Sequence, residues 1–184
     1  MIFHATAIAG VYEVALAPRA DERGFFARLF CADTMAAQGL QSEFPQINTS
    51  WCQWAGTFRG FHYQTGAAAE AKLVRCIRGA IFDAVVDLRA HSPTYGRALG
   101  IALTADNRRM LYLPQGVAHG YLSLQDDSEI IYLTSTRYTP AAEQGIRFDD
   151  PLVRLEWPLA PRWVSEKDRS WPTVTPHTLQ PEDA

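Results

Sequence analysis

The residue best suited to acid–base chemistry is His62, which lies in the segment Arg-Gly-Phe-His-Tyr-Gln of residues 59–64. An imidazole with an ordinary pKa near 6.5 exchanges a proton readily at neutral pH, so histidine commonly serves as a general base. Arg59 and Lys72 are cations close by in the sequence, and a cation stabilises the oxyanion that forms when a proton leaves the carbon beside a ketone. These residue types fit general acid–base chemistry in which a cation stabilises the developing negative charge.

Tyr132 is a candidate for the acid that returns the proton. It lies in the apolar segment 130–134, and a phenol with an ordinary pKa near 10 is protonated at neutral pH. Tyr132 could instead fill the core with its hydroxyl bonded to a backbone carbonyl, and His62 could be a structural histidine. The two residues alone leave both interpretations open.

A second histidine, His119, ends the segment Pro-Gln-Gly-Val-Ala-His of residues 114–119. This Pro-x-Gly-x-x-His pattern after a strand resembles the second motif of cupin barrels. Metal-binding cupins carry His-x-His and a later Glu in the first motif, where this chain has only His62. Two imidazoles without a third ligand are a poor site for zinc or non-haem iron, so we expect no bound metal.

The elements that must position these residues are predicted to be short strands separated by turns, which is typical of an all-β sandwich or barrel. Strands are expected at residues 72–78, 81–88, 98–103, 110–113, 118–124 and 129–135. Segment 81–88 is almost continuously apolar, which predicts burial on both faces.

Two short helical segments are expected outside the sheet. Asp33 could cap a helix over residues 34–38 that ends at Gly39, and a helical turn could form at residues 165–168. The tail after Trp157 is expected to be irregular because it contains Pro158, Pro161, Pro172 and Pro176.

Composition narrows the protein class. The 184 residues, 47% hydrophobic and 20% charged, suit one globular domain spanning 1–184. A net charge of −3 with scattered basic residues disfavours nucleic acid or an anionic membrane as a partner. The start lacks a secretory signal pattern and no apolar run reaches about 18 residues, which predicts a cytoplasmic protein without a membrane span. The three cysteines lack a Cys-x-x-Cys pair, so neither a disulfide framework nor a zinc knuckle is indicated.

Several segments in order along the chain carry a more specific signal. With these segments the chain resembles the dTDP-4-dehydrorhamnose 3,5-epimerase (RmlC-like) family of cupins. The matching segments are residues 21–26, 46–50, 59–64, 72–75, 82–89, 92–96, 118–120, Tyr132 and 165–168.

The resemblance implies a cupin double-stranded β-helix, or jelly-roll barrel, with short peripheral helices, present as a homodimer. It implies inversion of C3, C5 or both in a nucleotide-linked 4-keto-6-deoxyhexose, without a cofactor, in deoxysugar biosynthesis. His62 is then the base, Asp168 its orienting carboxylate and Tyr132 the proton donor. The positions implied to bind the sugar or nucleotide are Arg23, Gln46, Asn48, Arg59, Lys72, His119, Glu143 and Lys167.

One departure from the family pattern concerns the nucleotide. Family members usually carry a glutamate where this chain has Ala27-Arg28, and Arg28 reverses that charge. Two other functions stay open: a sugar-nucleotide-binding cupin that is catalytically silent, and a metal-dependent cupin enzyme.

Overall fold

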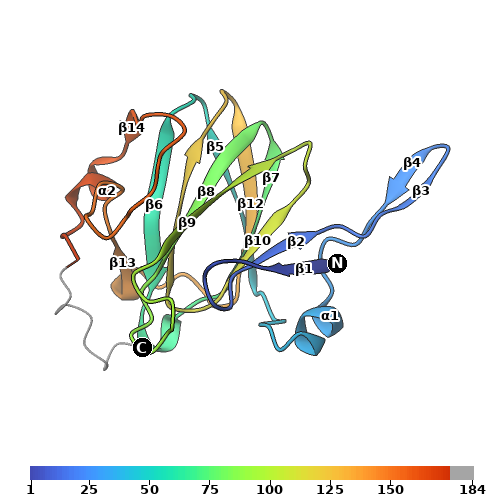
Figure 1. Cartoon of the computed structure of the whole chain (residues 1–184), viewed down its shortest axis with the longest axis horizontal. Coiled ribbons are helices and arrows are strands. Elements are labelled where there is room, and N and C mark those ends of the chain that lie inside the picture. Colours follow the sequence, from blue (N-terminus) through green and yellow to red (C-terminus); the bar gives the residue numbers. More distant parts are fainter. Residues whose placement is uncertain (175–184) are drawn as a thin grey trace.

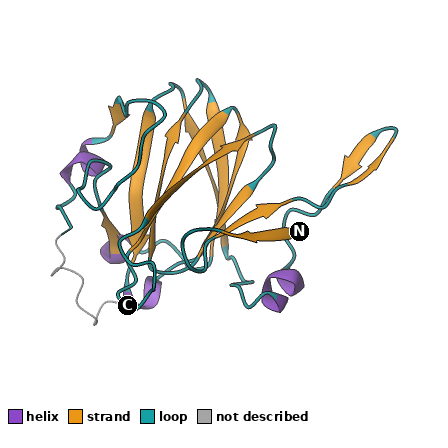
Figure 2. Cartoon of the chain, in the orientation of Figure 1, coloured by secondary structure: helices purple, strands orange, loops and turns teal. Residues whose placement is uncertain are grey.

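The computed structural model describes residues 1–174 and consists mainly of strands, in two large sheets that face each other (Figures 1 and 2). The first sheet has the order β1-β2-β10-β7-β12-β5. Its strands are β1 Ile2–Ala5, β2 Tyr12–Ala15, β10 Met110–Leu113, β7 Lys72–Arg78, β12 Ser128–Thr134 and β5 Gln46–Cys52.

The second sheet has the order β13-β6-β11-β8-β9, and a short strand β14 pairs in parallel with β6. Its strands are β13 Glu143–Gly145, β6 Thr57–Gln64, β11 Val117–Ser123, β8 Ala80–Asp87, β9 Ala98–Thr104 and β14 Trp163–Val164. All six strands predicted from the sequence are present within one or two residues. The all-β class is therefore confirmed.

The main core lies between the sheets. Val74 and Cys76 of β7 pack against Ile81 and Val85 of β8 in one cluster of fully buried side chains. Strand β8 is buried along almost its whole length, as its continuous apolar sequence predicts. Because alternate residues of a strand point to opposite faces, the residues of β7 that share a face with Val74 and Cys76 also point inward, and Lys72 is one of them.

The short helices lie outside the sheets (Figure 2). Helix α1 (Ala32–Ala37) begins one residue before Asp33, so the predicted cap is wrong: Cys31 occupies the N-cap and makes no side-chain cap hydrogen bond. Helix α2 (Glu166–Ser170) begins at the predicted turn, where the Ser165 side chain accepts a hydrogen bond from the Asp168 amide. Single 3₁₀ turns lie at Gly66–Ala68 and Pro140–Ala142.

Besides the expected helical turn, the tail contains the short strand β14, which was not predicted. Pro176 lies outside the described residues. Strands β3 (Arg19–Asp21) and β4 (Gly24–Phe26) form a hairpin that projects from the two sheets (Figure 1). Within residues 1–174, no helix has the length and apolarity needed to cross a membrane.

Strands β6 and β11 approach each other closely beside His62, which is paired in register with His119. A Cβ atom on Gly60 would lie 2.4 Å from the Gly120 Cα and 2.8 Å from the His119 carbonyl oxygen. Gly60 also has a φ of +129°, which side chains rarely adopt. Glycine at position 60 therefore allows the backbone contact that places the two histidines side by side.

We expect Gly60→Ala to lower the free energy of unfolding by about 3–4 kcal/mol, because overpacking and backbone strain act together. Gly24→Ala is the matched control, since Gly24 has the same φ of +129° and a Cβ atom added there would meet nothing within 4 Å. The control should lose only about 1–2 kcal/mol, the strain alone. Urea unfolding measures both losses, and equal values would show that the contact between β6 and β11 is not what requires glycine.

Candidate functional site

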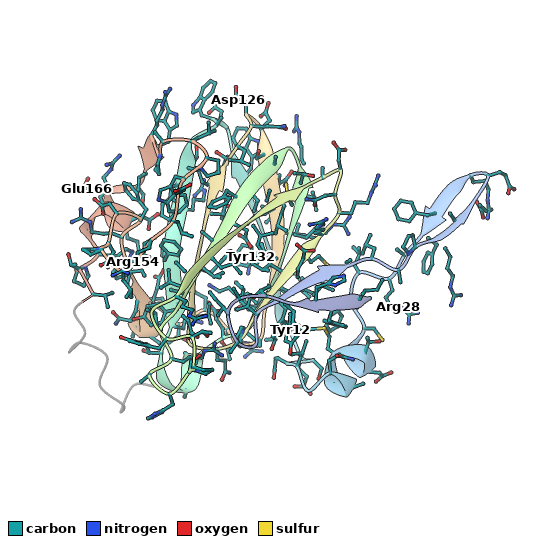
Figure 3. The ribbon with its side chains drawn as sticks, viewed as in Figure 1. Tyr12, Arg28, Asp126, Tyr132, Arg154 and Glu166 are labelled. Carbon is teal, nitrogen blue, oxygen red and sulfur yellow. The ribbon has the colours of Figure 1, made fainter. Side chains whose placement is uncertain are left out.

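The candidate site is a cavity between the two sheets. It consists of two adjoining hollows of about 550 and 410 Å³, and both are lined by His62, Lys72 and Tyr132. His62 comes from β6 in one sheet, whereas Lys72 and Tyr132 come from β7 and β12 in the other. Figure 3 shows Tyr132 among the strands rather than on the outer surface. We call this space the inter-sheet cavity.

Among the catalytic candidates in the cavity, His62 makes the shortest polar contact, and its partner is Asp168. The His62 Nε2 atom lies 2.6 Å from Asp168 Oδ1, and the Asp168 side chain is only 6% exposed. The other Asp168 oxygen accepts a hydrogen bond of 3.4 Å from the Gly60 amide. Asp168 therefore holds the imidazole ring by Nε2, and Nδ1 is the nitrogen left for chemistry in the cavity.

The carboxylate of Asp168 is kept ionised by its surroundings. Burial alone would raise its pKa. The hydrogen bond and the charge of His62, together with the hydrogen bond from the Gly60 amide, lower the pKa by more than burial raises it, so the net pKa lies below the ordinary 3.8. Because its pKa is lower in the folded state, the ionised carboxylate stabilises the fold. This stabilisation is complete at pH values above the pKa that the group has in the unfolded chain. That stabilisation is lost as the pH falls through the folded pKa.

Asp168→Asn is therefore expected to lower the free energy of unfolding by about 2 kcal/mol at neutral pH, the usual worth of a hydrogen bond to a charged group. The difference in the free energy of unfolding between the two proteins should shrink below about pH 4, where the unfolded wild-type chain begins to take up a proton on this carboxylate. Urea unfolding of both proteins across this pH range is the measurement. A difference that stays constant with pH would mean that the charge of Asp168 does not contribute.

Tyr132 faces the cavity from β12, between Asn48 on β5 and Val74 on β7 in the strand register. Its ring packs against the core cluster between the sheets. Burial raises the pKa of its phenol, the negative charge of Glu70 raises it further, and Arg59 lowers it. The net upward shift keeps the hydroxyl protonated at neutral pH, as a proton donor requires.

Two cations lie in the cavity with His62 and Tyr132. The Lys72 ammonium is 3.0 Å from Glu70 Oε1 and donates to the His62 carbonyl oxygen at 3.4 Å. The Arg59 guanidinium donates to Cys52 Sγ at 3.5 Å and to the Trp51 carbonyl at 3.1 Å. No carboxylate within residues 1–174 forms a salt bridge with Arg59, so its charge is available to an anionic ligand.

One end of the cavity carries the other predicted binding residues. Lys167 Nζ lies 2.6 Å from Glu143 Oε2, and the Tyr138 hydroxyl donates to the same oxygen at 2.6 Å. Gln46 accepts a hydrogen bond of 2.7 Å from the Tyr138 amide, and Asn48 lines the same hollow. The structure thus brings these four predicted positions around one opening.

His119 lies deeper, next to His62 across the β6–β11 pair. Its Nε2 atom is 2.7 Å from Asp83 Oδ1, and Asp83 is fully buried on β8. The sequence assigned Asp83 no role; in the structure it orients His119. The cavity therefore contains two histidine–carboxylate pairs on neighbouring strands, and His62 is the one whose ring is about one-third exposed.

Arg23 is the predicted binding residue that lies apart from the others. It sits on the β3–β4 hairpin, where its exposed guanidinium pairs with Asp21. Arg28 follows the same hairpin, and Figure 3 shows it outside the two sheets. Phe25 and Phe26 of β4 are also exposed on this hairpin. Neither Arg23 nor Arg28 reaches the cavity of its own chain.

The sequence did not single out Glu70, Tyr138 or Tyr121 as site residues. Glu70 has the signal that could have revealed it, because it lies two positions before Lys72 and alternate residues of an extended segment point the same way. The Tyr121 hydroxyl lies 2.8 Å from Ser50 Oγ beside Arg59. Among residues 1–174, no group of three His, Cys, Asp or Glu side chains is arranged to hold a metal ion.

Comparison with known proteins agrees with this geometry. The family model described as dTDP-4-dehydrorhamnose 3,5-epimerase matches residues 5–175. A dTDP-4-dehydrorhamnose 3,5-epimerase from Shigella flexneri is 42% identical over 149 residues, which are 80% of this chain and 82% of that protein. A dTDP-4-dehydrorhamnose 3-epimerase from Streptomyces niveus is 39% identical over 163 residues, 88% of this chain and 78% of that protein.

A solved structure is similar over nearly the whole fold. The dTDP-6-deoxy-D-glucose-3,5-epimerase of Legionella pneumophila, in complex with dTDP-4-keto-L-rhamnose, superposes with a TM-score of 0.85 at 34% identity. The match covers 92% of this chain and 90% of that one, and it confirms the predicted cupin-type fold. The chain belongs to the dTDP-4-dehydrorhamnose 3,5-epimerase family.

Proposed function

We propose that this chain is a cofactor-independent epimerase that inverts C3, C5 or both in a nucleotide-linked 4-keto-6-deoxyhexose of the dTDP-4-dehydro-6-deoxyglucose type. The observation that carries the proposal is the placement of a histidine–aspartate pair and a protonated phenol in one cavity, on opposing sheets. The names of the relatives support the substrate class, since they are epimerases of dTDP-linked deoxysugars.

The first step is removal of the proton on C3 or C5, which the neighbouring C4 ketone makes acidic. The His62 Nδ1 atom takes this proton, and the electron pair of the C–H bond moves toward the C4 oxygen to form an enolate. Lys72 and Arg59 stabilise the charge on that oxygen. Asp168 stabilises the imidazolium formed in this step by a charge-assisted hydrogen bond through Nε2, at 2.6 Å.

The second step returns a proton to the carbon from the opposite face. The Tyr132 hydroxyl gives its proton to the carbon as the C4 ketone re-forms, which leaves a phenolate. Exchange with solvent then removes the proton from His62 and restores one to Tyr132, so the sugar keeps its composition and only its configuration changes.

The remaining predicted residues are proposed to hold the nucleotide and the sugar. Lys167, Gln46 and Asn48 line the outer end of the cavity, and His119 lies inside it. Glu143 fixes Lys167 at 2.6 Å, so the ammonium is oriented before the substrate arrives. Lysine and arginine donors suit the diphosphate that links the base to the sugar.

We propose a homodimer, because the outer face of the first sheet exposes large apolar side chains. Ile47 and Trp51 on β5 are 68% and 47% exposed, and Ile77 on β7 is 42% exposed. In a two-fold dimer built on this face, the projecting hairpin would bring Arg23 to the cavity of the partner. Sedimentation equilibrium tests this assembly, and a monomer at micromolar concentration would contradict it.

The cytoplasm is the compartment we propose, since all three cysteines are free and disulfides are rare in reducing compartments. We further propose that residues 1–184 act as one domain.

The test is incubation with dTDP-4-keto-6-deoxyglucose in deuterated buffer, followed by NMR. We expect deuterium at C3, C5 or both, without added metal or nicotinamide. Tight binding without exchange would instead identify a catalytically silent binding protein. Exchange that depends on iron, zinc or manganese found by elemental analysis of the purified protein would identify a metal-dependent cupin.

A further inference from the structure

Glu70 is a buried carboxylate beside the inter-sheet cavity to which the proposed reaction assigns no step. Its Oε1 atom lies 3.0 Å from Lys72 Nζ, and the two side chains are only 10% and 9% exposed. Burying two charges carries a desolvation penalty that their attraction repays only with good geometry, so a buried ion pair is weak evidence for stability. This pair lies against the reacting groups, which directs attention to a role in the chemistry.

The Glu70 carboxylate is fixed by its second oxygen as well. The Gln64 Nε2 atom donates to Glu70 Oε2 at 3.0 Å and to the Ala68 carbonyl at 3.2 Å. Gln64 is itself buried, and its Oε1 atom accepts a hydrogen bond of 2.6 Å from the Thr139 amide. Because both carboxylate oxygens have buried partners, the position of the negative charge is set before any substrate binds.

The other two carboxylates that line the cavity are paired with other side chains. Asp168 lies 2.6 Å from the His62 ring, and Glu143 lies 2.6 Å from Lys167. Glu70 is thus the one carboxylate within residues 1–174 that forms a salt bridge with Lys72. Removal of its charge would leave Lys72 without an acidic partner.

Tyr132 faces charged or titratable groups from every element around the cavity. Arg59 and His62 come from β6, Lys72 from β7 and Glu70 from the segment before it. His119 and Tyr121 come from β11, and the far end contributes Lys167, Asp168, Tyr138 and Glu143. Of all these groups, Glu70 and Arg59 are the two whose charges act most on the phenol, and they act in opposite directions.

On the basis of the proposed epimerase reaction, we propose that Glu70 is a positioning residue. Its carboxylate aims the Lys72 ammonium into the cavity and places a fixed negative charge in the hollow that Tyr132 also lines, so that this phenol enters each turnover as an acid. The same charge disfavours the phenolate formed after proton transfer, which promotes recapture of a proton for the next turnover.

A titration of Tyr132 tests this role without substrate. The full-length chain is labelled with tyrosine carrying ¹³C at Cζ, and the signal of Tyr132 is identified by its loss in Tyr132→Phe. In Glu70→Gln, which keeps the side-chain length but removes the charge, we expect the Tyr132 midpoint to fall by about one pH unit. The alkaline limb of the pH profile of kcat should fall in the same direction. Glu70→Asp keeps the charge and should give a smaller decrease.

Glu129→Gln is the matched control, because it removes one charge from β12 itself. Glu129 accepts a hydrogen bond of 2.8 Å from the exposed Thr49 on the outer face of the sheet, so its loss should leave the midpoint unchanged. An unchanged midpoint in Glu70→Gln, or an equal shift in the control, overturns the proposal. If Glu70→Gln does not fold, Glu70→Ala takes its place, and an unchanged midpoint in that variant overturns the proposal.

Failure of this inference is distinguishable from failure of the proposed function. Absence of deuterium exchange in the wild-type protein would overturn the epimerase reaction, whereas the titration midpoints decide the effect of Glu70 whether or not the substrate reacts.

Discussion

Replacement of His62 by asparagine is expected to lower the rate of deuterium exchange at both C3 and C5 by about 10²–10⁴-fold, the usual contribution of a general base. Asparagine has no group that accepts the proton at neutral pH, although it can still donate a hydrogen bond to Asp168. The exchange rate is measured by NMR with saturating substrate, so that weaker binding cannot account for the loss.

His91→Asn is the control for this variant. His91 lies in an exposed turn between β8 and β9, and it does not line the cavity. Its replacement should leave the exchange rate within about twofold of the wild type, as expected of a surface substitution. Exchange that persists in His62→Asn would show that another group removes the proton, and the assignment of the base would be wrong.

Tyr132→Phe is expected to lower the rate of inverted product formation by about 10²-fold, the lower part of the range for general acids. Removal of the proton by His62 needs no phenol, so deprotonation at C5 should be less affected than inversion. The variant should therefore return deuterium-labelled substrate with its original configuration. NMR of the recovered sugar separates this exchange from inversion.

Tyr112→Phe is the matched control, because it removes a phenolic hydroxyl from a buried tyrosine outside the cavity. That hydroxyl accepts a hydrogen bond of 3.1 Å from the Gln41 amide, so its loss should affect stability and not inversion. If Tyr132→Phe reduces exchange and inversion equally, His62 and Tyr132 do not have separate roles.

The strands of the middle of the chain were predictable because their burial follows their sequence. Strand β8 is apolar almost throughout and is buried on both faces. Strand β5 was not predicted. Its burial pattern is the reverse of the usual one, because its polar side chains face inward and its large apolar side chains face outward. Gln46, Asn48 and Ser50 line the cavity, whereas Ile47 and Trp51 are exposed on the other face. A strand with a polar inner face cannot be recognised from hydrophobic alternation alone.

The candidate site was predictable in part for a similar reason. His62, Lys72 and His119 lie in compact motifs whose residues follow one another in sequence. Asp168 lies 106 residues after His62, and the contact at 2.6 Å exists because α2 returns to β6. The pairing of Asp83 with His119 and the effect of Glu70 on Tyr132 likewise depend on strands that are distant in sequence.

The sequence by itself predicted the strand-rich class, because local patterns carry that information, and through a family resemblance it predicted the acid, the base and the cations. Only the tertiary structure paired Glu70 with Lys72, Asp83 with His119 and Glu143 with Lys167. Ion pairing and pKa values depend on distances of a few ångströms and on burial, and both arise only when the two sheets pack together.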